Sequence, residues 1–214
     1  MLDPGNTPCI ILKEDATVKD FQTSTVTVGK SIMGNETFPN LLLNEYPEVF
    51  RSELGCLKGY VHHIRLVQGA TPVCSKVCSV PFSVREDMKK EIDKLMTAGI
   101  IQEVEGTEWL APVVAARKPN GTLRLCIDVR KLNKNIVIDK YPLPNITDML
   151  TLLDGATVFS NIDLASAYHQ IELGDDSKDY TACVTPFGTY RFNRLPFGLI
   201  SAASVFQRAL EKVL

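Results

Sequence analysis

Two apolar stretches on either side of an Asn-Gly pair constrain the fold of this chain more than any other feature. The stretches are "APVVAAR" and "LRLCI", and Asn120-Gly121 lies between them. Asn-Gly is the preferred dipeptide of two-residue hairpin turns, and alternating apolar residues on both sides pair as antiparallel strands. The sequence therefore predicts a β-hairpin within residues 111–133.

The clearest helix signal precedes this hairpin, in residues 83–99. Ser83 and Glu86 have the spacing of a capping box, which predicts that the helix begins at Ser83. Gly99 predicts its end, because glycine readily adopts the left-handed conformation that closes a helix. Apolar residues recur at helical spacing along one face, at Val84, Met88, Ile92, Leu95 and Met96.

Strand and helix signals are mixed along the rest of the chain. In chain order they predict extended segments in residues 60–82, a short helix from about 145 to 153, a strand ending at Asp163, a hairpin turning at Phe187-Gly188 and a C-terminal helix in 201–214. Such a mixture is typical of an α+β domain. Residues 1–59 carry weaker signals and are expected to form an extended N-terminal arm, with a short helix in 41–50 broken by Pro47.

Positive charge is concentrated on the first hairpin. The 214 residues carry a net charge of −2, which argues against a nucleic-acid binder that uses its whole surface. Residues 117–134 nevertheless hold one acid, Asp128, and six cations, Arg117, Lys118, Arg124, Arg130, Lys131 and Lys134. Arginine suits bidentate phosphate contacts, so Arg117 and Arg124 could face a triphosphate. The alternative is a solvated basic hairpin that protects a sheet edge.

Asp163 ends an apolar run in "FSNIDLASAYHQIEL". A carboxylate at the end of a strand is a common way to hold Mg²⁺, which prefers oxygen ligands. The alternative is an Asp that caps the helical turn "LASAY", and one residue can do both.

Gly198 in "LPFGLISAASVFQ" precedes a helix whose first turn has small side chains. Such a turn allows a base or sugar to approach the backbone closely, although ordinary helix–sheet packing would need the same residues.

Six cysteines are scattered without regular spacing, which indicates reduced thiols in an intracellular protein. Cys74 and Cys78, with His62 and His63 upstream, could form a zinc site, but "CSKVC" alternates like a strand and lacks the usual paired spacing. The chain has no run of 18 apolar residues, so no membrane partner is expected.

Five segments in one order resemble the reverse transcriptase of gypsy-type LTR retrotransposons, and more distantly the retroviral enzymes. They are "MTAGIIQEV", "WLAPVVAARKPNGTLRLCIDVRKLN", "YPLPNITDMLTLLDGATVFSNIDLASAYHQIEL", "TPFGTYRFNRLPFGL" and "SAASVFQRAL". The resemblance covers about residues 60–214. It implies an RNA-directed DNA polymerase with right-hand fingers and a partial palm, an antiparallel sheet and helices on one face. Residues 1–59 would then lie upstream of the polymerase in a longer Pol polyprotein.

The resemblance also implies roles for individual residues. Asp163 corresponds to the first catalytic aspartate, which bridges two Mg²⁺ ions, with the Leu164 carbonyl as a further ligand. Arg124 corresponds to the arginine that contacts the incoming deoxynucleoside triphosphate, and Tyr168 to the aromatic residue under the sugar that excludes a 2′-OH. The remaining nucleotide-binding positions are Arg117, Lys118, Ala167, Phe197 and Gly198. Arg117 stands where the family usually has lysine, and Ala203 where it usually has proline.

The family's remaining catalytic carboxylates lie in a Tyr-x-Asp-Asp box downstream of the "FQRAL" helix, and this chain ends at Leu214. Asp175 and Asp176 in "LGDDS" are not expected to replace them, because no aromatic residue precedes them. The resemblance therefore implies a fragment that is inactive alone, with an exposed sheet edge and a tendency to self-associate. Its partners would be RNA/DNA template-primer and the rest of the polyprotein, in a cytoplasmic virus-like particle. The alternative is a non-catalytic relic that binds nucleic acid or protein.

Overall fold

The computed structural model describes residues 23–28, 47, 53–117, 123–155 and 160–213. The first half of the described chain contains β1 (Thr23–Val28), β2 (Val61–His62), α2 (Phe82–Thr97), β3 (Ile101–Glu103), β4 (Ala111–Arg117), β5 (Leu123–Ile127) and α3 (Arg130–Asn133). The second half contains α4 (Ile146–Leu152), β6 (Ser160–Leu164), η1 (Ala167–Gln170), β7 (Glu172–Leu173), α5 (Asp175–Lys178), η2 (Asp179–Thr181), β8 (Cys183–Thr185), β9 (Gly188–Phe192) and α6 (Ala202–Glu211). No described helix has the length and apolar character needed to cross a bilayer.

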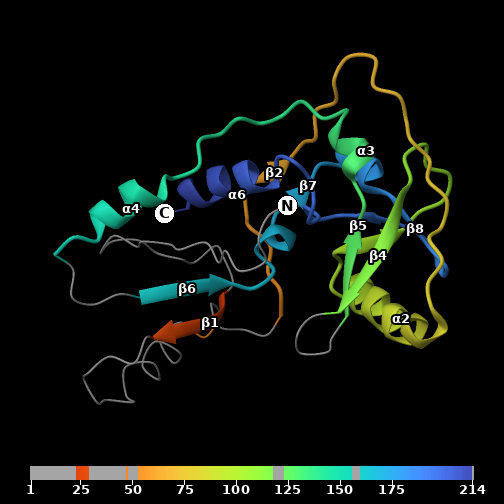
Figure 1. Ribbon diagram of the computed structural model, residues 1–214, viewed down its shortest axis with the longest axis horizontal. Coiled ribbons are helices and arrows are strands. Elements are labelled where there is room, and N and C mark those ends of the chain that lie inside the picture. The colour runs from red at the N-terminus through yellow and green to blue at the C-terminus, as the bar shows by residue number, and fades with distance from the viewer. Residues whose placement is uncertain (1–22, 29–46, 48–52, 118–122, 156–159, 214) are drawn as a thin grey trace.

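A five-stranded sheet in the order β3-β9-β8-β4-β5 organises the larger part of the fold (Figure 1). β4 and β5 pair antiparallel from Val113↔Ile127 to Arg117↔Leu123, which confirms the two strands of the first expected hairpin. Its Asn120-Gly121 turn lies outside the described residues. β8 and β9 form the second hairpin, and their last pair is Thr185↔Gly188. The turn is therefore Pro186-Phe187, one residue earlier than the sequence predicts.

The expectation of an antiparallel sheet is wrong in one respect, because the two hairpins join through a parallel pair, β4 and β8. Each hairpin can be predicted from its local turn, but the strands that join them are about 70 residues apart in sequence. Their relative direction depends on the long connection between them. The sheet is consequently mixed.

Helix α2 packs on this sheet through Met88 and Ile92, which are fully buried, while Val84 and Leu95 flank the core. Met96 is 38% exposed, so the apolar face is narrower than its sequence suggests. The expected capping box at Ser83 is wrong. The helix begins at Phe82 after Pro81, without a side-chain cap, which leaves Ser83 inside the first turn. Gly99 ends the helix as expected, with φ +66° and its N–H donating to the Met96 carbonyl at 2.9 Å.

The remaining elements complete the surroundings of the candidate site. α4 begins after Asn145, whose side chain accepts from the Thr147 N–H at 3.0 Å, in agreement with the expected short helix. α6 begins at Ala202, so Ala203 lies in its first turn, and the helix buries Val205, Phe206 and Ala209. The segment 60–82 is mostly irregular. Its one strand is the two-residue β2, which pairs in parallel with β7, and isolated bridges join Leu66 to Ile136 and Cys74 to Leu110. The expected helix in 41–50 lies outside the described residues apart from Pro47.

Strand β6, which carries Asp163, belongs to a separate two-stranded sheet with β1. The pairs run from Thr23↔Leu164 through Thr25↔Asp163 to Val28↔Ser160. Residues from the N-terminal part of the chain thus cover one edge of β6, as Figure 1 shows.

Candidate functional site

The ring of Phe197 is the centre of the candidate site. The guanidinium carbon of Arg124 lies 4.1 Å from the ring centroid, which is the geometry of a cation–π contact. The ring of Tyr168 lies 5.2 Å away between centroids, and that of His169 lies 4.9 Å away. Three residues predicted from separate parts of the sequence, on β5, on η1 and before α6, therefore meet at one point.

The turn after β6 places Tyr168 at this centre. Ser166 has φ 43° and ψ 48°, and it is the one described non-glycine residue in the left-handed region. This conformation costs on the order of 1 kcal/mol and persists where surrounding contacts enforce it. Here the Gln170 side chain donates to the Ala165 carbonyl at 2.8 Å, and the His169 N–H donates to the Ser166 carbonyl at 2.8 Å. The chain thereby reverses immediately after β6.

The positions of Asp163 and Leu164 are defined by β6 itself. Asp163 is the penultimate residue of the strand, and Leu164, the last residue, is buried. The residue at the N-cap of the following turn is Ser166 rather than Asp163, and it forms no side-chain cap. Ala167 begins this turn and packs against the core. The two residues implied to hold metal thus lie directly before the turn that carries Tyr168.

The loop that carries Phe197 is held by a side chain that sequence reasoning missed. Asn133, the last residue of α3, donates through Nδ2 to the Gly198 carbonyl at 2.9 Å and accepts through Oδ1 from the Ile200 N–H at 3.0 Å. Gly198 has φ +99°, and a Cβ there would lie 3.3 Å from Val129 Cγ2. Only glycine therefore suits this turn. No sequence pattern indicates Asn133, since its partners are 65 or more residues away.

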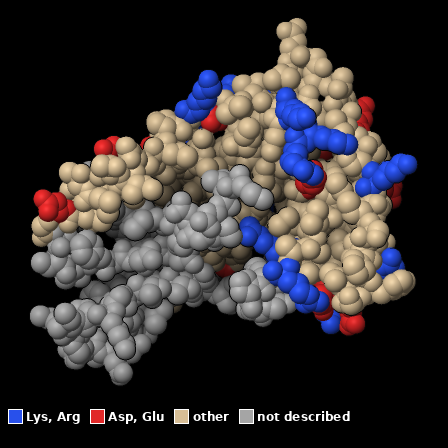
Figure 2. Space-filling model, in the orientation of Figure 1, with Lys and Arg blue, Asp and Glu red and all other residues tan. Residues whose placement is uncertain are grey.

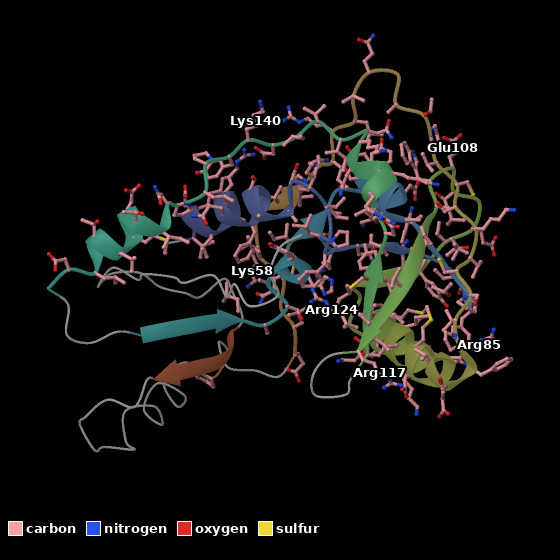
Figure 3. All side chains as sticks on the ribbon, viewed as in Figure 1. Lys58, Arg85, Glu108, Arg117, Arg124 and Lys140 are labelled. Atoms are coloured by element: carbon pink, nitrogen blue, oxygen red, sulfur yellow. The ribbon has the colours of Figure 1, made fainter. Side chains whose placement is uncertain are left out.

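Arg117 and Arg124 lie on opposite faces of the β4–β5 hairpin. Arg124 is paired with Ala116 and Arg117 with Leu123, and adjacent pairs in a ladder point to opposite sides. Arg117 approaches Asp87 of α2 at 3.4 Å. Figure 3 shows Arg117 beside α2. The structure therefore does not bring the two arginines together at Phe197. Lys118 lies outside the described residues.

Asp175 and Asp176 are used elsewhere. Both are exposed residues of the short helix α5. Asp175 accepts from Lys178 at 2.6 Å, and Asp176 contacts His63 Nδ1 at 2.8 Å. These hydrogen bonds hold the pKa of each carboxyl below its usual value. Both side chains thus have partners among residues that are not candidate site residues, Lys178 and His63.

The described residues contain no group of three His, Cys, Asp or Glu side chains able to hold a metal ion. Cys74 and Cys78, the suggested zinc ligands, are both exposed free thiols, and the other described cysteines are free as well.

The electrostatic character of the site is positive. Burial, together with the charges of Arg124 and Arg194, lowers the pKa of His169 to about 4, so this imidazole is neutral at pH 7. Burial also raises the pKa of Tyr168.

A second basic region lies over α3. Figure 2 shows Lys and Arg side chains gathered there. A shallow hollow of about 480 Å³ adjoins them and is lined by Ser75, Pro112, Asp128, Arg130, Lys131 and Lys134. Arg130 forms a bidentate pair with Asp128, at 2.8 and 2.6 Å, which lowers the pKa of that carboxyl. Lys131 and Lys134 thus supply the net positive charge of this surface.

Comparison with known proteins agrees with these features. Residues 116–214 match the family described as reverse transcriptase (RNA-dependent DNA polymerase). The chain is 35% identical over 200 residues to the retrovirus-related Pol polyprotein from transposon 412 of Drosophila melanogaster, across 82% of this chain and 16% of the relative. It is 38% identical over 148 residues to the Pol polyprotein from transposon gypsy of the same organism, across 67% of this chain and 14% of the relative.

Solved structures show the same fold. The foamy virus protease–reverse transcriptase CSH mutant aligns with a TM-score of 0.69 at 19% identity, over 86% of this chain and 25% of that chain. The foamy viral enzyme in complex with an RNA/DNA hybrid aligns with a TM-score of 0.69 at 20% identity, over the same shares.

The chain belongs to the reverse transcriptase family. Within that family its curated relatives are the Pol polyproteins of retrotransposons, including gypsy, as the sequence motifs indicated. The chain spans about one sixth of the length of the first of these relatives.

Proposed function

We propose that this chain is the nucleotide-binding part of an RNA-directed DNA polymerase, which adds deoxynucleotides to a primer when joined to the rest of a Pol polyprotein. The observation that carries the proposal is the contact of Arg124 and Tyr168 with the ring of Phe197, at 4.1 and 5.2 Å. A cation for the triphosphate and a ring for the sugar are thereby held beside the end of β6, where Asp163 lies.

Each residue has a separate part in this proposal. Arg124 would neutralise the phosphates, since a guanidinium remains charged and offers paired donors. Its stacking on Phe197 limits the directions in which those donors can point. Tyr168 would form the floor under the sugar, and its ring, fixed between Phe197 and Phe206, would leave no room for a 2′-OH. Positioning and charge neutralisation supply most of the rate in phosphoryl transfer.

The donor set at the end of β6 fits Mg²⁺ in part. The carboxylate of Asp163 and the carbonyl of Leu164 are both oxygen donors, which Mg²⁺ prefers. When bound, two such ions would activate the primer hydroxyl and stabilise the leaving pyrophosphate. The described residues offer no cluster of further ligands, and Asp175 and Asp176 are paired elsewhere. The other carboxylates would come from the longer polyprotein, so we expect the 214-residue chain alone to be inactive.

Primer extension on an RNA template by the full-length parent tests the proposal. Asp163→Asn is expected to abolish deoxynucleotide incorporation, and Arg124→Gln to raise KM for the deoxynucleoside triphosphate about 10- to 100-fold, because a charge-assisted contact is lost. Arg191→Gln is the matched control, since Arg191 of β9 is paired with Asp179 of η2. Undiminished incorporation by the Asp163 variant would overturn the proposal.

Sugar selection gives a second, independent measurement. Tyr168→Ala is expected to increase the use of ribonucleotides relative to deoxynucleotides, because it opens the space that the ring occupies. Phe206→Ala also removes a ring that contacts Tyr168, but one that is buried in α6, and should leave the ratio nearer to that of the native enzyme. An unchanged ratio in the Tyr168 variant would remove Tyr168 from the proposed role.

A further inference from the structure

Gln170 has a polar side chain that is completely buried, with 0% exposure. Its Nε2 atom donates to the Ala165 carbonyl at 2.8 Å, five residues earlier in the chain. A buried amide that loses its hydrogen bond is costly, so this bond constrains where the Ala165 carbonyl lies. The family resemblance implies roles for Ala167 and Tyr168 in the same turn, but none for Gln170.

The bond from Gln170 fixes the peptide group between Ala165 and Ser166. The Ser166 nitrogen belongs to that peptide, so a rotation of the peptide changes the φ of Ser166. Ser166 has φ 43° and ψ 48°, its side chain forms no cap, and the residue is exposed. Serine does not favour this left-handed conformation by itself. Contacts from outside Ser166 must therefore hold the turn, and the Gln170 amide is one of them.

Gln170 is itself anchored to the core through the backbone. Its carbonyl accepts from the Leu57 N–H at 2.7 Å, and the carbonyl of the next residue, Ile171, accepts from the Leu195 N–H at 2.9 Å. Leu57, Ile171 and Leu195 are all buried. The Gln170 side chain thus joins a fixed part of the core to the turn after β6.

The turn that Gln170 holds lies between two residues with a proposed role. Leu164, the implied metal ligand, directly precedes Ala165, and Tyr168 follows Ser166 by two residues. The Tyr168 ring lies 5.2 Å from the Phe197 ring between centroids. A rotation of the peptide between Ala165 and Ser166 would change the path of the chain between the end of β6 and this ring.

We infer that Gln170 is a positioning residue for sugar selection, which holds the peptide between Ala165 and Ser166 and thereby keeps the Tyr168 ring under the sugar of the incoming nucleotide. The inference deepens the proposed function and rests on it. Because Gln170 is buried, it does not contact the nucleotide, and its loss allows the turn to move without removing a contact to the substrate. Discrimination against ribonucleotides should therefore fall more than the rate with deoxynucleotides.

Primer extension by the full-length parent, with matched deoxy- and ribonucleoside triphosphates, tests the inference. Gln170→Met keeps the length of the side chain and removes the donor. It is expected to lower the ratio of kcat/KM for deoxynucleotides to kcat/KM for ribonucleotides about two- to tenfold, the range that corresponds to the loss of one neutral hydrogen bond. Gln207→Met is the matched control, because the Gln207 amide donates to Glu211 at 2.9 Å on the exposed side of α6, and it should leave the ratio unchanged.

Two double variants measure what a merely structural glutamine would not change. Glycine adopts a positive φ without strain, so Ser166→Gly makes the turn less dependent on the Gln170 amide. Gln170→Met with Ser166→Gly should regain most of the lost discrimination. Gln170→Met with Tyr168→Ala should lower the ratio no further than Tyr168→Ala alone, because Gln170 acts through that ring. Thermal unfolding of each variant of the 214-residue chain shows whether it folds.

The outcomes separate the inference from the proposed function. A lowered ratio in Gln170→Met that Ser166→Gly restores, with no further loss in the Tyr168→Ala background, supports the inference. An unchanged ratio in Gln170→Met, from a parent that extends primers, overturns the inference and leaves the proposed function intact.

A structural glutamine gives a different pattern. Gln170→Met then has a lowered melting temperature and a ratio that Ser166→Gly does not restore, or it folds in neither background, and either result overturns the inference. If the native parent extends no primer, the proposed function is contradicted and the inference falls with it.

Discussion

Asn133 joins two parts of the candidate site that are distant in sequence. Its amide donates to the Gly198 carbonyl and accepts from the Ile200 N–H, so one side chain fixes the backbone on both sides of Leu199. The orientation of Phe197, which directly precedes Gly198, depends on this loop. Asn133 is thus a positioning residue, which acts on the candidate site through Phe197.

We expect Asn133→Ala to lower the free energy of unfolding by about 1–3 kcal/mol, because two backbone groups lose their partner. Urea unfolding followed by circular dichroism measures this change. Asn135→Ala is the matched control, since Asn135 makes one local bond, to the Lys131 carbonyl at 3.1 Å. Its loss should cost about 0.5–1.5 kcal/mol. Equal costs for the two variants would contradict the bridging role of Asn133.

A buried histidine, His169, and a half-buried one, His62, predict how stability depends on pH. Burial lowers the pKa of His169 and of His62 to about 4, from an ordinary value of 6.5. Between pH 6.5 and 4, these two imidazoles therefore bind protons in the unfolded chain but not in the folded chain. Stability is unaffected above pH 6.5 and falls as pH decreases, by up to about 1.4 kcal/mol per pH unit for each histidine.

Urea unfolding at intervals between pH 7.5 and 4.5 measures this slope. The carboxyls whose pKa is lowered, such as those of Asp128 and Glu211, have ordinary values of 3.8 and 4.5 and contribute mainly below this range. His169→Gln and His62→Gln should each remove about half of the slope, because glutamine does not titrate. A stability that is constant from pH 7 to 5 would show that these imidazoles are not buried as neutral groups.

Residues that lie within a local sequence motif could be selected from the sequence. Arg124, Tyr168 and Phe197 lie in motifs that the family resemblance identifies, and the structure brings them together. Asn133 could not be found in this way, because its contacts join segments that are 65 or more residues apart. The pairing of Arg117 with Asp87 likewise depends on which face of the hairpin meets α2.

At the scale of elements, local signals predicted strands and helices better than their ends or their arrangement. The two hairpins and α2 are present because each has its turn or its apolar face within a few residues. α2 begins at Phe82, one residue before the predicted start at Ser83. Pro81 precedes it, and the fixed φ of proline suits the entry to a helix. The parallel pairing of β4 with β8 carries no local signal.

The pairing of β1 with β6 makes a testable prediction about association. The family resemblance implies an exposed sheet edge, and in the structure β1 covers one edge of β6 through five residue pairs. Val26, which is paired with Ile162, lies in the middle of this ladder. Val26→Pro removes a backbone donor and is expected to release the edge, which then pairs with other copies of the chain.

Size-exclusion chromatography with light scattering over a range of concentrations measures this association. Val26→Pro should shift the chain towards dimers and larger species at concentrations where the native chain is smaller. Val26→Thr is the control, because threonine keeps the N–H group and favours strands. A Val26→Pro variant with the same mass distribution as the native chain would show that β1 does not protect β6.

At the scale of the whole molecule, the charge of one surface differs in sign from the net charge of the chain. The chain carries −2 overall, yet the surface over α3 is basic, as Figure 2 shows. Neutralisation of Arg130 by Asp128 at 2.6 Å leaves Lys131 and Lys134, both exposed, as its effective cations. A chain that would be excluded as a nucleic-acid binder on net charge alone therefore has one local surface suited to a phosphate backbone.

If this surface binds the template strand, affinity for a nucleic-acid duplex should fall with salt, with a slope of log K against log salt of about −0.9 for each phosphate neutralised. Lys131→Gln combined with Lys134→Gln should reduce the slope by up to about 2. Fluorescence anisotropy of a labelled RNA/DNA duplex between 25 and about 200 mM salt gives both values. The matched control is Lys89→Gln with Lys90→Gln on α2, where Lys90 is paired with Glu86 at 2.9 Å. Both double variants change the net charge equally, so a general electrostatic effect would reduce the two slopes alike. A binding surface over α3 requires that only the variant at Lys131 and Lys134 show the reduced slope.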